Sequence, residues 1–190
     1  MDVRITATWT WTQTERQRRR RCGLGVFVRV IAIDPGVTGA LAVLESAAEP
    51  GKPPSILAVH DLPSYAEKTS SGKTKNYIDP VALHKLLKSI GKVDRIICER
   101  LTSPPGISSI VAFSLGATSG TIASVLRLSG NGYKLVSPSV WKRALDCPAD
   151  KELARQYATK LFANDEHWQR KKQHNRAEAA LIGAWFLMIN

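Results

Sequence analysis

The chain has 190 residues, enough for one domain with a substantial hydrophobic core and too few for two. Its formal net charge is +11, from 27 Lys and Arg against 16 Asp and Glu, which favours a polyanionic partner such as nucleic acid. Its three cysteines are widely spaced, and no apolar run approaches the roughly 18 residues of a membrane span. Composition therefore argues against a disulfide scaffold, a zinc domain and a membrane protein.

The N-terminal segment differs from the rest of the chain in composition. Six arginines against Asp2 and Glu15 give the first 25 residues a net charge of +4, and the segment lacks the long apolar stretch of a secretion signal. We interpret residues 1–25 as a basic, disordered arm and residues 26–190 as a single domain. We expect a cytoplasmic protein without a secretion signal or transmembrane segment.

The first part of the domain predicts three strands. Val26 to Ile33 is rich in β-branched residues and almost continuously apolar, which is typical of a central strand buried on both faces. Gly39 to Glu45 is predicted to pair with it as an antiparallel hairpin, and Ser55 to His60 gives a third strand. The polar segment Leu62 to Pro80 has Gly, Ser and Lys without periodicity, which predicts a flexible basic loop.

The later elements alternate between helix and strand. They are a helix opened by Asp79-Pro80 and ended by Gly91, a strand at Val93 to Cys98, a long helix at Ser108 to Leu128, a strand at Tyr133 to Val136, and helices at 139–145, 151–162 and about 175–188. This order predicts an α/β fold with a five-stranded mixed sheet, three antiparallel strands and then two parallel ones, flanked by helices. It is the order of elements in an RNase H-like fold.

Two carboxylates fall at the ends of predicted strands. Asp34 ends the first strand and Glu99 follows the fourth, so parallel neighbours about 4.8 Å apart would present both side chains at one edge of the sheet. Asp34 with Pro35 and Gly36 also has a simpler interpretation as turn chemistry, and Glu99 as an exposed strand end. Two carboxylates so close need a counter-charge, which a divalent cation provides.

A third carboxylate lies in the last helix. Glu178 sits in the first turn of a helix that is otherwise apolar, and His174 precedes it by one helical turn. Glu178 has an alternative role as a carboxylate favoured by the helix dipole, and His174 as a solvated side chain. Together with Asp34 and Glu99, these oxygen-rich ligands suit Mg²⁺ or Mn²⁺ better than zinc.

At this point the chain resembles the RuvC-like Holliday junction resolvases, most closely the variants of phages and prophages. The matching segments are "IAIDPGVTGAL", "DLPS…GKTKNYIDPVALHKLL", "RIICERL", "FSLGATSGTIASVL", "VSPSVWKRAL…DKELARQYATKLF" and "HNRAEAALIG", in family order over about Arg29 to Leu187. The resemblance implies an RNase H-like fold, a homodimer in a prokaryotic or phage-infected cell, and Mg²⁺-dependent nicking of four-way DNA junctions in recombination and repair.

The resemblance also implies roles for individual residues. Asp34, Glu99 and Glu178 match the metal ligands, His174 matches an additional catalytic position, and Lys142 resembles a basic residue that approaches the cleaved strand. Many members place this additional position three residues before the last acid, which would select Asn175 here. The phage-like variants have a spacing of four to a Glu, which favours His174, and Asn175 stays the alternative.

A two-metal mechanism follows from this implied site. Two Mg²⁺ ions, for which Mn²⁺ substitutes, would lie roughly 3.5–4 Å apart on the scissile phosphate, with Asp34 bridging them and Lys142 offsetting phosphate charge. No small-molecule cofactor is expected. The basic loop "KTSSGKTK" and the "WKR" helix are the predicted contacts to the DNA backbone, while Trp141 and Trp168 are predicted to be core residues.

Three other interpretations stay open. The loop "DPGVTG" is close to the first phosphate loop of actin-like ATPases and sugar kinases, although such proteins need two copies of the fold. A junction- or duplex-binding module that has lost cleavage would keep the basic charge. A nuclease acting on RNA–DNA hybrids, or an integrase-like strand cutter, would use the same carboxylates.

Overall fold

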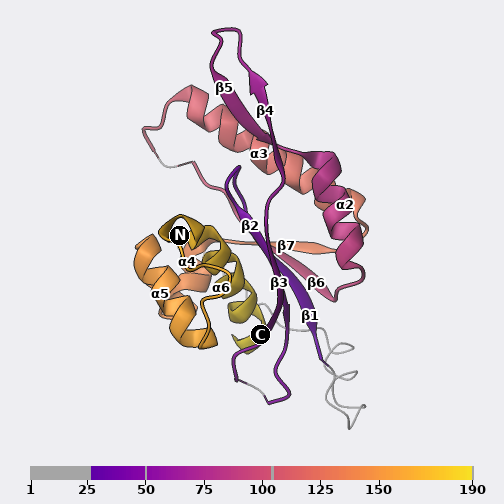
Figure 1. Cartoon of the computed structure of the whole chain (residues 1–190), viewed down its shortest axis with the longest axis vertical. Coiled ribbons are helices and arrows are strands. Elements are labelled where there is room, and N and C mark those ends of the chain that lie inside the picture. The colour runs from indigo at the N-terminus through magenta and orange to yellow at the C-terminus, as the bar shows by residue number, and fades with distance from the viewer. Residues whose placement is uncertain (1–26, 50, 104, 190) are drawn as a thin grey trace, which may run out of the picture.

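The computed structural model of the chain describes residues 27–49, 51–103 and 105–189 (Figure 1). The basic arm predicted at residues 1–25 lies outside the described residues, so that interpretation stays a prediction. The described elements are β1 (Arg29–Asp34), β2 (Ala40–Glu45), β3 (Ser55–Asp61), β4 (Ser64–Lys68), β5 (Thr74–Ile78), α2 (Pro80–Ile90), β6 (Arg95–Glu99), α3 (Ser109–Leu128), β7 (Tyr133–Val136), α4 (Pro138–Ala144), α5 (Lys151–Phe162), a 3₁₀ turn η1 (Lys171–Gln173) and α6 (His174–Ile189).

The main sheet has the predicted composition and topology. Its five strands lie in the order β3-β2-β1-β6-β7. β1 pairs with β2 and β2 with β3 in antiparallel fashion, whereas β1 pairs with β6 and β6 with β7 in parallel. The carboxyl ends of β1 and β6 therefore meet at one edge of the sheet, as the predicted mixed α/β fold requires.

Helices cover both faces of this sheet, so its central strand is buried on both sides. Val30 and Ala32 of β1 pack in the core beneath α4, α5 and α6. The alternate residues Ile31 and Ile33 pack in the second core, beneath α2 and α3. Figure 1 shows these two groups of helices on opposite sides of the strands. The nearly continuous apolar run of β1 is explained by this two-sided burial.

The segment predicted as a flexible loop is a folded β-hairpin. Strands β4 and β5 pair in antiparallel register as a separate two-stranded sheet, with Tyr65 opposite Tyr77. The two tyrosine rings stack with their centroids 5.8 Å apart. Lys75 Nζ donates a hydrogen bond to Ser114 Oγ of α3 at 2.6 Å. Cross-strand and tertiary contacts therefore order a segment that has no apolar periodicity of its own.

Helix α3 is largely apolar but only partly covered. Its buried residues are Ile122, Val125 and Leu126, all in its second half, whereas Ile110 and Phe113 are 74% and 77% exposed. Among the described residues, α3 is also the one helix whose length and hydropathy meet the criteria for a membrane span, with only 17% of that window buried. This corrects the expectation that no apolar run would approach that length.

Candidate active site at the sheet edge

Asp34 is the last residue of β1, and a tight turn fixes its position. The turn is closed by a hydrogen bond from the backbone N–H of Gly39 to the carbonyl of Gly36, at 2.9 Å. A Cβ atom on Gly39 would lie 2.2 Å from the carbonyl oxygen of Asp34 and 2.7 Å from the nitrogen of Gly36. Glycine is therefore required at position 39, because the backbone approaches itself too closely for a side chain.

Glu99 ends the neighbouring strand at the same edge. The parallel register pairs Ile33 of β1 with Cys98 of β6, so Asp34 and Glu99 each follow a paired residue. The indole Nε1 of Trp141 donates a hydrogen bond to Glu99 Oε2 at 2.6 Å. Trp141 is fully buried, as the sequence predicted, and its indole N–H holds the carboxylate in a fixed orientation.

Glu178 approaches this edge from α6. Its side chain is 10% exposed, and Lys142 of α4 lies 2.6 Å from its Oε1 atom. The same ammonium lies 5.1 Å from the ring centroid of Trp141. Burial lowers the pKa of Lys142, but the hydrogen bond and the charge of Glu178 outweigh burial and raise that pKa above its usual value. Lys142 is therefore a charged partner of the candidate site.

The pKa values of the strand-end carboxyls show how closely the acids are grouped. Burial raises the pKa of Asp34 well above its usual range, and the charges of Glu178 and Glu99 raise it further, against the opposing charges of Lys151 and Lys142. Burial also raises the pKa of Glu99, although the indole hydrogen bond that it accepts acts in the opposite direction. Asp34 therefore lies near enough to the other two carboxylates for their charges to disfavour its ionised form.

His174 begins α6 and lies beside Lys151, the first residue of α5. Its Nδ1 atom is 3.1 Å from the carbonyl oxygen of Lys171, and its Nε2 atom is 3.2 Å from Lys151 Nζ. Because a carbonyl only accepts hydrogen bonds, Nδ1 carries the proton, and Nε2 presents a lone pair to the ammonium. His174 is therefore connected to the carboxylates through Lys151, whose charge reaches Asp34 and Glu99.

Asn175, the alternative to His174, has a structural role. The residue is buried, and its Nδ2 atom donates to the carbonyl oxygen of Thr38 at 2.6 Å and lies 3.2 Å from the hydroxyl of Thr38. These contacts join the start of α6 to the turn that follows Asp34. The amide nitrogen of Asn175 is thus committed to positioning that turn.

The structure groups four of the five predicted site residues directly and adds two that sequence reasoning missed. Lys142 contacts Glu178, and the charges of Glu99, Glu178 and Lys142 act on Asp34, whereas His174 joins them through Lys151. Lys151 was missed because nothing marks it beyond its place after the helix cap Asp150. The hydrogen bond from the indole of Trp141 had a signal, because a buried tryptophan usually finds an acceptor for its N–H.

The structure also bears on the expected metal ions. Among the residues that it describes, no three His, Cys, Asp or Glu side chains converge closely enough, as they stand, to hold a metal ion. Lys142 and Trp141 each engage a carboxylate oxygen, of Glu178 and Glu99 respectively. The metal site predicted from the sequence therefore stays a prediction.

Comparison with known proteins places this arrangement in a recognisable fold. No protein-family model matches the chain, and no curated protein matches it in sequence. Among solved structures, Thermus thermophilus RuvC in complex with a Holliday junction substrate matches with a TM-score of 0.56 and 16% identity, over 86% of this chain and 97% of that one. A second Thermus thermophilus RuvC structure matches with a TM-score of 0.57 and 17% identity, over 85% and 96%.

A third structure extends the likeness beyond bacteria. The yeast mitochondrial Holliday junction resolvase Ydc2 matches with a TM-score of 0.53 and 15% identity, over 85% of this chain and 79% of that one. The mixed five-stranded sheet with helices on both faces agrees with these neighbours. The chain therefore has the RNase H-like fold of the RuvC-type Holliday junction resolvases.

Proposed function

We propose that the chain is a structure-selective endodeoxyribonuclease that nicks four-way DNA junctions. The observation that carries this proposal is the meeting of Asp34, Glu99 and Glu178 at one edge of the sheet, with Lys142 and Lys151 beside them. The shared fold with RuvC, which has been solved with a Holliday junction substrate, supports the choice of DNA substrate. The net charge of +11 suits a polyanion.

The residues at this edge fit divalent cations by the chemistry of their donor atoms. Carboxylate oxygens are hard ligands that suit Mg²⁺, with Mn²⁺ as a substitute. Asp34, Glu99 and Glu178 would together hold the ions, of which we propose two per site. When bound, such ions supply charge stabilisation at the phosphate and a more nucleophilic water. Buried carboxylates that repel one another also favour an added cation.

The chain's own residues would prepare the phosphate for in-line attack. Trp141 keeps Glu99 in place through its indole hydrogen bond. Lys142 and Lys151 place two ammonium groups beside the carboxylates, where they would offset charge that develops on the phosphate. The Nε2 atom of His174, unprotonated in the observed hydrogen-bond pattern, would accept a proton from water or orient it.

We also infer that two copies of the chain associate through α3. Its exposed face carries Ile110, Phe113 and Leu128, which are 74–77% exposed, with Gly116 and Gly120 between them. No atom lies within 4 Å of a Cβ built on either glycine, so a second helix has room to approach closely. A four-way junction has two strands to cut, and a twofold dimer would supply two sites.

One cleavage experiment tests this proposal. Labelled four-way junction, linear duplex and RNA–DNA hybrid are incubated with the protein in Mg²⁺, beside Asp34→Asn and the exposed control Asp165→Asn. We expect paired nicks in the junction alone. Asp34→Asn should lower the rate by more than about 100-fold with binding retained, since even the outer partners of metal ligands typically cost 10–100-fold.

Other results of this experiment would contradict the proposed function or the assigned site. Equal cutting of the linear duplex contradicts the resolvase assignment, and preferential cutting of the hybrid indicates a different nuclease. Junction binding without cleavage by the unmodified protein indicates a DNA-binding module. A loss of cleavage in Asp165→Asn as large as that in Asp34→Asn contradicts the assigned site.

A further inference from the structure

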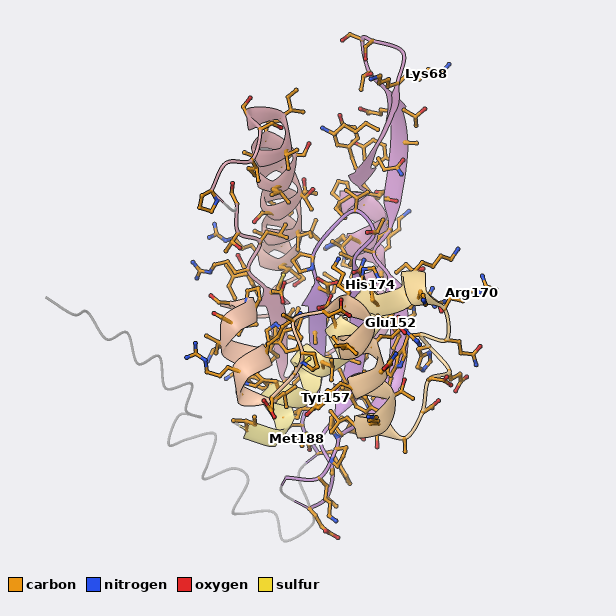
Figure 2. All side chains as sticks on the ribbon, turned by 90° about the vertical axis from the view of Figure 1, so that its left-hand side faces the viewer. Lys68, Glu152, Tyr157, Arg170, His174 and Met188 are labelled. Carbon is orange, nitrogen blue, oxygen red and sulfur yellow. The ribbon has the colours of Figure 1, made fainter. Side chains whose placement is uncertain are left out.

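The β4–β5 hairpin projects from the main sheet without contributing to that sheet. All five residues of β4 are exposed, and Ile78 is the buried residue of β5. In Figure 2 the hairpin, with Lys68 labelled near its tip, extends past the level of His174 and away from the end of the molecule where Met188 lies. A two-stranded sheet of this kind is marginally stable alone, so the contacts that hold it are informative.

The base of the hairpin is attached to the candidate active site on two sides. The backbone N–H of Leu62 donates to the carbonyl of Gly39, in the turn after Asp34, at 2.9 Å. Asp61, at the end of β3, accepts two hydrogen bonds from the guanidinium of Arg176, at 2.7 and 2.5 Å. Arg176 lies in the first turn of α6. The hairpin is therefore anchored to the turn that follows Asp34 and to the helix that carries Glu178.

The tip of the hairpin is an ordered turn. The backbone N–H of Thr69 donates to the carbonyl of Lys73 at 2.8 Å, and that of Gly72 donates to the carbonyl of Thr69 at 2.8 Å. The hydroxyl of Thr69 also donates to the carbonyl of Lys73 at 3.0 Å. Gly72 adopts φ +77°, which the turn requires and glycine permits. The lysines at the tip are thus held by a defined backbone.

The three lysines of the hairpin are used differently. Lys75 is half-buried, donates to Ser114 of α3 and lies 5.3 Å from the ring centroid of Tyr77, so it supports the hairpin. Lys68 and Lys73 are exposed on opposite sides of the turn, next to the exposed hydroxyls of Ser70 and Ser71. Glu67 is the one acid within residues 64–78, which leaves a net positive arm.

We propose that this hairpin binds the phosphate backbone of one duplex arm of the substrate, through Lys68 and Lys73; the inference rests on the proposed junction nuclease. Five paired residues at about 3.4 Å each place the tip roughly 17 Å beyond its base. The same distance is about five base pairs of duplex, at 3.4 Å each. The arm would thus contact phosphates about five base pairs from the cut and fix the register of the duplex.

Junction binding at different salt concentrations tests the inference. The test variant is Lys68→Ala with Lys73→Ala. The matched control, Lys52→Ala with Lys92→Ala, removes two exposed lysines at the opposite end of the sheet. All binding is measured in the Asp34→Asn background, between about 50 and 200 mM salt, on junctions with arms of about 12 base pairs.

We expect the hairpin variant to bind on the order of tenfold more weakly, as expected for two lost charged contacts. Its slope of log K against log salt should be shallower by about 1.8, because two phosphates are no longer neutralised. The slope of the control variant should stay closer to that of the unmodified hairpin than the slope of the hairpin variant does. On junctions whose loop-capped arms are about four base pairs long, the hairpin variant should bind as well as the control.

Other results overturn the inference in distinguishable ways. Equal affinities and slopes for the hairpin variant and the control, in a protein that cuts junctions, overturn the hairpin contact alone. A change of oligomeric state in the hairpin variant with an unchanged salt slope shows instead that the hairpin contacts a second copy. Absence of DNA binding by the unmodified protein overturns both this inference and the proposed function.

Discussion

Helices α3 and α6 are both long and apolar, but the fold treats them differently. In α6 almost every residue from Asn175 to Phe186 is buried, because the sheet lies on one side and α4 and α5 cover the others. In α3 burial begins only at Ile122, and the first half of the helix extends beyond the core. An apolar helix therefore indicates burial, but only its neighbours show whether this chain provides that burial.

The difference also separates two tasks. The covered helix carries Glu178 into the candidate site, where a precise position matters. The partly covered helix keeps an apolar face for another molecule, which we infer to be a second copy of the chain. Substitutions in the two helices should therefore have effects of different kinds.

The largest effect is expected at the exposed face of α3. Phe113→Ser should separate the dimer, since burying one such side chain contributes about 1.5–3 kcal/mol and a twofold interface contains it twice. The dimer dissociation constant should rise by more than about 100-fold, at about 1.4 kcal/mol per tenfold. Light scattering after size exclusion should show the mass falling from twice 20.8 kDa to 20.8 kDa.

The control for Phe113→Ser is Leu153→Ser, which changes a half-exposed hydrophobic residue of a different helix, α5. It should leave the measured mass unchanged. A monomeric unmodified protein would contradict the inferred dimer, and a dimer that survives Phe113→Ser would place the interface elsewhere.

A pair of leucines compares the two helices in stability. Leu181 of α6 is fully buried, whereas Leu128 of α3 is 77% exposed. Leu181→Ala should lower the free energy of unfolding by about 2–5 kcal/mol, because it removes contacts and leaves a cavity. Leu128→Ala should change it by less than about 0.5 kcal/mol in the monomer. Urea denaturation at low protein concentration measures both, and equal losses would contradict the assigned burial.

A pair of glycines should give opposite signs. A Cβ on Gly183 of α6 would lie 2.3 Å from Leu44 Cδ1 and 3.2 Å from Ala32 Cβ, so Gly183→Ala should destabilise by about 1–3 kcal/mol. A Cβ on Gly120 of α3 meets no atom within 4 Å. Gly120→Ala should stabilise the monomer by about 0.4–1 kcal/mol. Destabilisation by both changes, in the same urea assay, would show that α3 is covered within one chain.

Local signals explain how much of the fold could be predicted from the sequence. The strands of the main sheet are apolar runs separated by turn residues, and the helix start at Pro80 carries its own cap. Asp79 Oδ1 accepts hydrogen bonds from the backbone N–H groups of Val81 and Ala82, each at 2.9 Å. The hairpin was missed because it is ordered by the stacking of Tyr65 on Tyr77 and by the hydrogen bond from Lys75 to α3. No local sequence pattern encodes these contacts.

In the candidate site, too, local signals predicted some residues, whereas contacts between distant parts of the chain decided the others. Asp34 and Glu99 could be predicted because strand order alone places them at one edge. The choice between His174 and Asn175 could not, since it depends on a hydrogen bond from Asn175 to Thr38, 137 residues earlier. Lys151 was missed for a similar reason, because its partner His174 is 23 residues away in sequence.

The smallest effect is expected where α6 is tied to β3. The hydrogen bonds from Arg176, together with its charge, hold the pKa of Asp61 below its usual value, although burial acts in the opposite direction. A carboxyl whose pKa is lowered by folding stabilises the protein above its unfolded pKa, near 3.9, and loses that contribution as pH falls through the lower folded value. Because the side chain of Asp61 is 63% exposed, solvent screening limits the contribution.

Asp61→Asn should therefore lower the free energy of unfolding at pH 7 by about 0.2–1 kcal/mol. The difference from the unmodified protein should shrink as the pH falls below about 4, and urea denaturation at several pH values measures it. In an Arg176→Met background the same change should have a smaller pH-dependent effect, because the partner charge is gone and only the weaker influence of His60 and Lys172 is left. A difference that grows at low pH would contradict the sign of this effect, and with it the role of the Asp61–Arg176 ion pair in anchoring the start of α6. The first half of α3 has no charged residue to form such a pair and is held instead by the hydrogen bond from Lys75 to Ser114.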